Sequence, residues 1–80
     1  MITRTRTRTR TRSLVAEALF VSDLQPSQVP SARTVQTAID QTIQRYGAAG
    51  CAARMACEFG DHPELAVRRM IWVRRLMTAA

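Results

Sequence analysis

The chain has 80 residues, of which 46% are hydrophobic, and it carries a formal net charge of +6. That apolar fraction argues against a wholly disordered chain, and the length allows one domain whose small core would benefit from a partner subunit. No apolar run approaches the roughly 18 residues of a transmembrane helix, and no cleavage site follows the apolar stretch at residues 14–21. We therefore expect a cytoplasmic protein with no membrane partner.

The positive charge is concentrated in an N-terminal Thr-Arg repeat. The repeat contains five arginines and no acid: Arg4, Arg6, Arg8, Arg10 and Arg12. The rest of the chain is nearly neutral, with seven arginines against six acids. Because neither side of an extended repeat would be apolar, residues 1–12 are predicted to be a disordered basic arm that contacts nucleic acid nonspecifically. An alternative interpretation is that the arm results from a misassigned start codon, ahead of an adaptor with no nucleic-acid role.

Residues 13–80 are predicted to form an all-α domain, a small three- to four-helix bundle. The first helix is expected at residues 14–22, with Ser13 as its N-cap. A loop containing Pro26 and Pro30 follows, because each proline disfavours helix at the residue before it.

The second helix, at residues 32–46 with Ser31 as its N-cap, has the clearest pattern. Its apolar residues recur at spacings of three and four and so share one face: Val35, Ile39, Ile43 and Tyr46. Gly47 is expected to end it in a left-handed conformation.

The third and fourth helices are expected at residues 50–59 and 62–78. The buried side of the third would consist of Ala52, Met55, Ala56 and Phe59, and Gly60 would end it. Asp61 and Glu64 have the spacing of a capping box, and Pro63 would lie in the first turn of the fourth helix.

The fourth helix is apolar on two sides. One side is predicted to be a core stripe of Ala66, Met70, Val73 and Met77. The other side allows two interpretations. In one, Trp72 packs under the first helix, with the stems of Arg68 and Arg75 over it. In the other, the side is a surface for a protein partner or a phosphate backbone, formed by Arg68, Arg69, Ile71, Trp72 and Arg75.

Residues 52–76 resemble a helix-turn-helix of the DNA-binding kind. The matching residues are Ala56, Phe59 and Gly60, followed by Val67, Met70 and Ile71. The resemblance implies a transcriptional regulator in which Arg68 and Arg69 supply the base-reading donors. The sequence departs from the motif at Asp61, where a small apolar turn residue is usual, and its later apolar positions come one residue late.

A broader resemblance covers Ala18 to Leu76. It rests on the segments Gly50-Cys51-Ala52-Ala53-Arg54 and Glu58-Phe59-Gly60-Asp61-His62-Pro63-Glu64. These are similar to a group of short uncharacterised helical proteins of high-GC, actinobacterial-type bacteria. No activity is assigned to that group, so the resemblance implies a fold and no chemistry.

The residues that could support chemistry are few and poorly spaced. Cys51 and Cys57 are six apart on one predicted helix and diverge by about 240°, which disfavours an internal disulfide and a shared metal. Both thiols are expected to be small buried hydrophobic groups, although a disulfide between chains stays possible. His62 is expected at a helix cap. We therefore expect no enzyme activity, metal, cofactor or small-molecule substrate.

Together these features favour a non-enzymatic helical protein-interaction module. Its partner would be another protein or a second copy in a homodimer, and the basic arm would add contacts to nucleic acid. The DNA-binding regulator and the adaptor remain the alternatives.

Overall fold

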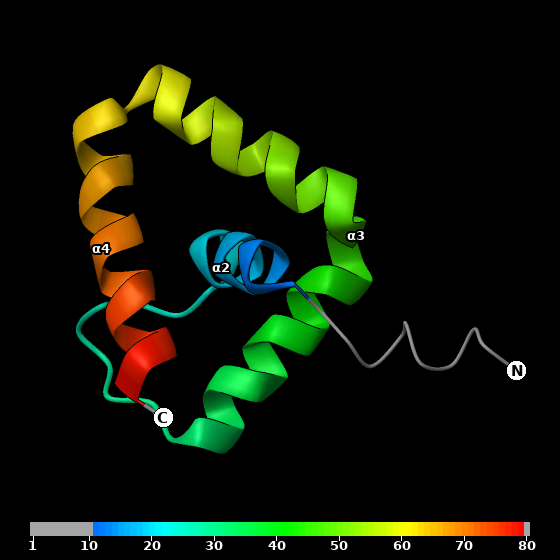
Figure 1. Ribbon diagram of the computed structural model, residues 1–80, viewed down its shortest axis with the longest axis vertical. Helices are drawn as coiled ribbons and strands as arrows, with labels where there is room; N and C mark the ends of the chain where they lie inside the picture. The colour runs from blue at the N-terminus through cyan, green and yellow to red at the C-terminus, as the bar shows by residue number, and fades with distance from the viewer. Residues whose placement is uncertain (1–10, 80) are drawn as a thin grey trace, which may run out of the picture.

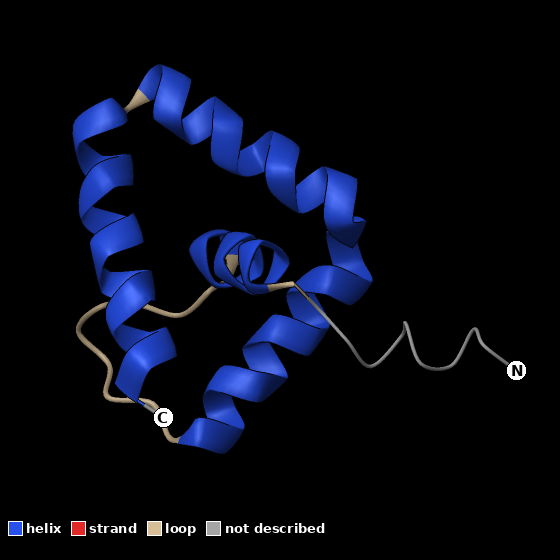
Figure 2. Ribbon diagram, in the orientation of Figure 1, coloured by secondary structure: helices blue, strands red, loops and turns tan. Residues whose placement is uncertain are grey.

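The computed structural model describes residues 11–79 and has three α-helices and no strand within them (Figures 1 and 2). Helix α2 spans Arg12–Val21, α3 spans Ala32–Asp61 and α4 spans Pro63–Ala79. The all-α prediction is confirmed for this part of the chain. The predicted disorder of the arm, with Arg4, Arg6, Arg8 and Arg10, lies outside the described residues.

Helix α2 begins before the predicted position. The amide of Leu14 donates to Oγ1 of Thr11 at 3.0 Å, and the amide of Val15 donates to the Thr11 carbonyl at 3.1 Å. Thr11 is therefore the N-cap, and the prediction of Ser13 in that role is wrong. Both residues carry a suitable hydroxyl, but the earlier one allows a longer helix. As a consequence Arg12 belongs to α2 and not to the arm.

Helix α3 contains both the second and the third predicted helices. Ser31 caps it as expected, because its Oγ accepts from the amide of Thr34 at 3.1 Å. Gly47 interrupts it with φ 72° and ψ 171°, a conformation that is open to glycine and costly for other residues. The helix continues directly after this kink, so the predicted gap before residue 50 is absent.

The junction between α3 and α4 also differs from expectation. Gly60 lies inside α3, which ends at Asp61 with His62 as its C-cap. The amide of His62 donates to the Glu58 carbonyl at 2.7 Å, and the His62 carbonyl accepts from the amide of Ala66 at 2.9 Å. His62 thus joins the two helices, so the predicted stop at Gly60 and the capping box starting at Asp61 are wrong. Pro63 is the first residue of α4, where its missing amide proton costs nothing.

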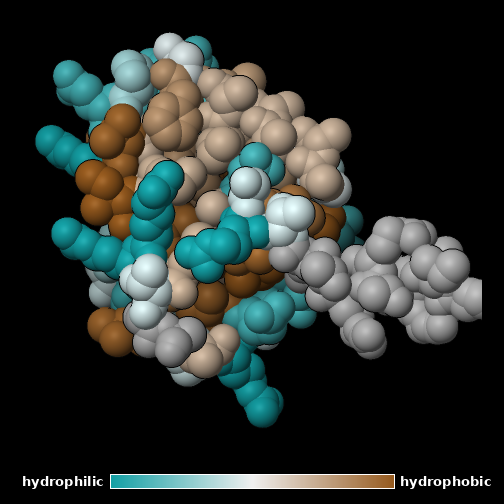
Figure 3. Space-filling view, viewed as in Figure 1, coloured by the Kyte–Doolittle hydropathy of each residue, from teal (hydrophilic) through white to brown (hydrophobic). Residues whose placement is uncertain are grey.

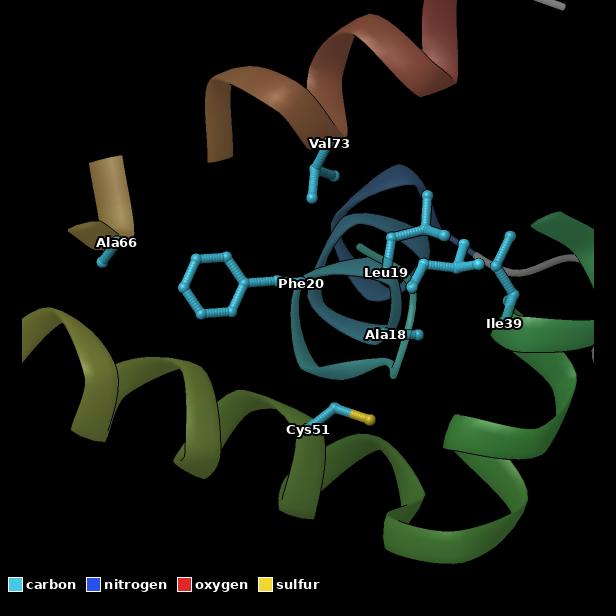
Figure 4. Packing of buried hydrophobic residues seen from close by; sticks show 8 residues of the cluster. Ala18, Leu19, Phe20, Ile39, Cys51, Ala66 and Val73 are labelled. Carbon is cyan, nitrogen blue, oxygen red and sulfur yellow. The ribbon is translucent and has the colours of Figure 1, made fainter. Parts of the chain in front are cut away.

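The core lies around α2, which contacts both other helices and is seen nearly end-on between them (Figure 1). Its fully or almost fully buried apolar residues are Ala18, Leu19, Phe20, Leu24, Ile39, Cys51, Ala66 and Val73. In Figure 4 the ring of Phe20 points toward α4, while Cys51 of α3 lies beneath Ala18. The rings of Phe20 and Phe59 stack with centroids 5.6 Å apart. A short helix inserted between two longer ones therefore provides the shared core of the fold.

Candidate interaction surface on helix α4

Helix α4 presents two different faces. Its predicted core stripe is confirmed: Ala66 and Val73 are buried, and Met70 and Met77 are packed against the core. On the opposite side, Val67 and Ile71 keep 49% and 47% of their surface exposed. Figure 3 shows hydrophobic surface on the α4 side of the molecule, with hydrophilic side chains projecting beside it.

We define the outer face of α4 as its solvent-facing residues spaced three or four apart. Helical geometry places such residues on one side of the helix. Besides Thr78 near the C-terminal end, the face consists of six exposed residues: Glu64, Val67, Arg68, Ile71, Arg74 and Arg75. The face thus has two aliphatic side chains in its middle, an acid near its N-terminal end and arginines elsewhere.

Arg69, one residue after Arg68, is turned into the molecule. Its Nε donates to the carbonyl of Phe20 at 2.6 Å, and its Nη2 donates to the carbonyls of Ser22 at 3.0 Å and Leu24 at 2.9 Å. The guanidinium therefore binds the C-terminal end of α2 and the start of the loop that follows it, where carbonyls lack helical partners and the helix dipole is negative. Burial lowers the pKa of Arg69 from its ordinary value. These contacts leave Arg69 poorly placed to bind a partner.

Trp72 is half-buried and packs against the core. The guanidinium that covers it belongs to Arg69, 4.6 Å from the ring centre, whereas the interpretation from sequence assigned this role to Arg68 and Arg75. Those two side chains are exposed. The structure therefore divides the predicted surface: Arg69 and Trp72 face inward, and Arg68, Ile71 and Arg75 face outward.

The surface also includes three residues that were not predicted to belong to it: Glu64, Val67 and Arg74. Val67 precedes Ile71 by four residues, so helical spacing alone could have grouped the two. Leu65 is also prominent, with 60% of its surface exposed, but it lies toward the side of α4 that faces α3 residues Arg54 and Cys57.

The two cysteines have different environments. Cys51 is fully buried and its thiol lies 3.9 Å from the carbonyl of Thr42, to which it donates. Burial, followed by the charge of Glu17, raises the pKa of Cys51, and Arg54 partly opposes this effect. Cys57 is exposed, so the prediction that both thiols are buried is wrong for Cys57. Six residues along a helix turn the second thiol away from the core.

Catalytic and metal-binding groups do not gather at the outer face. Within residues 11–79, no group of three or more His, Cys, Asp or Glu side chains is arranged to hold a metal ion. His62, for which a cap position was expected, is the C-cap of α3. In the same residue range, no helix is long and apolar enough to cross a membrane.

The two helices that resemble a helix-turn-helix meet at a corner in Figure 1. A single non-helical residue, His62, connects them, whereas the DNA-binding motif uses a turn of about three to four residues. Of the two expected base-reading residues, Arg68 is exposed and Arg69 binds the end of α2.

A second apolar feature is a hollow of about 450 Å³ between α2 and the facing ends of α3 and α4. Its apolar lining includes Val15, Leu19, Val35, Ile39, Leu76 and Met77. These side chains are buried or half-buried, so the hollow exposes less of each aliphatic group than the outer face of α4 does.

No protein-family model matches the chain, and the searches found neither a curated protein nor a solved structure similar to it. The surface itself must therefore support any functional conclusion.

Proposed function

We propose that the protein is a non-enzymatic interaction module that self-associates through the outer face of α4. The observation that carries this proposal is the pair Val67 and Ile71, which lie one helical turn apart and are each about half exposed on the same face. Adjacent aliphatic groups rimmed by polar side chains are a feature of protein interfaces. Isolated exposed apolar residues such as Val29 have no such neighbours on a helix.

Energetics favour a second copy as the partner. Fully burying a Val or Ile side chain contributes roughly 1.5–3 kcal/mol, and these two retain about half of that gain for an interface. In a twofold dimer each residue contributes twice. A domain of this size has a small core, so burial between copies also adds to the stability of the fold.

The test is sedimentation velocity of the full chain over micromolar to near-millimolar concentrations. We expect the weight-average sedimentation coefficient to rise with concentration. Ile71→Asp should suppress this rise, because a charge on each copy would be desolvated at the interface. Val29→Asp is the matched control: it replaces an aliphatic side chain that is 97% exposed in a loop, and it should associate like wild type. A wild-type chain that stays monomeric throughout would contradict the proposal.

Nucleic-acid binding by the same face is the second candidate, because Arg68, Arg74 and Arg75 are all exposed on it. Binding of the full chain to a mixed-sequence duplex should then lose affinity on Arg68→Ala and Arg75→Ala. Each substitution should reduce the salt slope by about one if the arginine neutralises a phosphate. Unchanged affinity and slope would assign any binding to the arm and would remove this candidate for α4.

A further inference from the structure

The charges at the two ends of the outer face of α4 differ in sign, and Arg68 lies one turn after the single acid of the helix, Glu64. Three exposed acids lie at its N-terminal end and the adjoining end of α3: Glu58, Asp61 and Glu64. Arg74 and Arg75 are exposed near the C-terminal end, and the aliphatic pair lies between. A partner that matches this face must present arginines opposite the acids and acids opposite the arginines.

We propose that the partner is a second copy of this chain, whose α4 packs antiparallel to the first α4 across a twofold axis close to Ile71. This inference rests on the proposed function and adds the geometry of the pair. Glu64 and Arg75 are eleven residues apart, or about 16 Å along a helix. An antiparallel arrangement therefore brings Glu64 of each copy beside Arg75 of the other. A parallel arrangement would bring like charges together.

Two further features agree with the antiparallel arrangement. Ile71 lies near the middle of the span from residue 64 to residue 75, so the Ile71 side chains of the two copies meet close to the axis, where burial is greatest. Arg68 lies on the other side of that midpoint, and its aliphatic stem can cover Ile71 of the opposite copy while its charge stays in water. The helix dipoles also oppose each other in this arrangement.

The dimer is expected to be weak and salt-sensitive. One helix packed on one helix buries less area than a standard stable interface. The charge pairs lie at the rim, where salt screens them. The difference in dissociation constant between wild type and a variant with one of these pairs broken should therefore shrink as ionic strength rises, while the contribution of Ile71 should persist.

A charge exchange tests the arrangement directly. The dimer dissociation constant is measured by sedimentation equilibrium for wild type, Glu64→Arg, Arg75→Glu and the double variant Glu64→Arg/Arg75→Glu. Each single variant should weaken the dimer about threefold to tenfold, because twofold symmetry places two repulsive pairs where two attractive pairs stood. The double variant re-forms opposite-charge pairs, so its dissociation constant should return to within about twofold of wild type.

Two controls show whether a change in the dissociation constant comes from the charge pairing, from loss of folding or from the change in net charge. Arg33→Glu makes the same change in net charge as Arg75→Glu at an exposed position on α3, and it should not weaken the dimer by more than about twofold. Thermal unfolding followed by circular dichroism checks that each variant is folded. In the double variant, Arg at position 64 and Glu at position 75 are both charges that the dipole of α4 disfavours at those ends. Restored association therefore cannot result from a more stable helix.

The outcomes distinguish this inference from the proposed function. Single variants that stay like wild type, or a double variant without recovery, overturn the antiparallel pairing. If Ile71→Asp still abolishes association in that case, self-association through the outer face of α4 stands. A wild-type chain that is monomeric at every concentration overturns both.

Discussion

The inward and outward sides of α4 use the same residue types for different purposes. Arg69 binds the carbonyls at the end of α2, whereas Arg68 extends into solvent. Val73 is fully buried, whereas Ile71 keeps nearly half of its surface exposed. The difference arises from a rotation of about 100° per residue and not from composition. An apolar or cationic residue on this helix therefore acquires its role from the element that it faces.

The largest expected effect separates the two arginines. Arg69→Met should lower the free energy of unfolding by about 3 kcal/mol or more, because it removes charge-assisted hydrogen bonds to the carbonyls of Phe20, Ser22 and Leu24, at and just after the end of α2. Arg68→Met, the matched control, should change it by less than about 0.5 kcal/mol. Urea unfolding below the association range measures both. If Arg69→Met lowers the free energy of unfolding as little as Arg68→Met does, the inward contacts do not stabilise the fold.

The buried Val73 and the exposed Ile71 should give the next largest contrast. Val73→Ala removes two methyl groups from a site with no exposed surface and should cost about 2 kcal/mol of unfolding free energy. Ile71→Ala should cost less than about 0.5 kcal/mol in the monomer, yet it should weaken self-association. Chemical denaturation at low concentration and sedimentation at high concentration report the two effects separately. If Ile71→Ala destabilises the monomer as much as Val73→Ala does, the two faces do not differ in their contribution to the stability of the fold.

The smallest effect concerns the thiols. Because the pKa of Cys51 is raised in the folded protein, its contribution to stability is present below the ordinary thiol pKa, about 8.5, and is lost as pH rises through the folded pKa. The free energy of unfolding should therefore fall by up to about 1.4 kcal/mol per pH unit in that window. Cys51→Ala should remove this contribution to the slope, which denaturant titrations at several alkaline pH values can measure.

Reactivity extends the contrast between the thiols. The exposed Cys57 should react with iodoacetamide in the native protein, while Cys51 reacts only after unfolding. Mass spectrometry of the alkylated peptides identifies the modified residue. Rapid native labelling of Cys51 would contradict its burial.

Local sequence signals predicted the features of the fold that depend on nearby residues. The apolar period of α4 identified Ala66 and Val73 as core, and Gly47 was recognised as a break because its neighbours form a regular helical pattern. The predictions of the N-cap of α2 and of a helix end at Gly60 were wrong because two local signals compete at each of these places. Thr11 and Ser13 are both good caps, and Gly60 permits a helix to continue as well as to stop.

The role of Arg69 could not be predicted for a different reason. Its carbonyl partners are 45 to 50 residues away in the sequence, and they are available only because α2 ends beside α4. Helical spacing places Arg69 near the core stripe but does not reveal what it meets there. For the thiols, the divergence of about 240° already indicated that Cys51 and Cys57 face different sides; which of them is exposed depends on the side of α3 that lies against α2.

The most direct test of the outer face is a dilution series followed by amide chemical shifts of the isotopically labelled chain. Self-association through this face predicts concentration-dependent shifts concentrated at residues 64–75 of α4, largest around Ile71 and absent from Val29. Shifts that cluster instead around Val35 and Leu76 would place the contact at the apolar hollow. A spectrum that does not change with concentration would contradict self-association altogether.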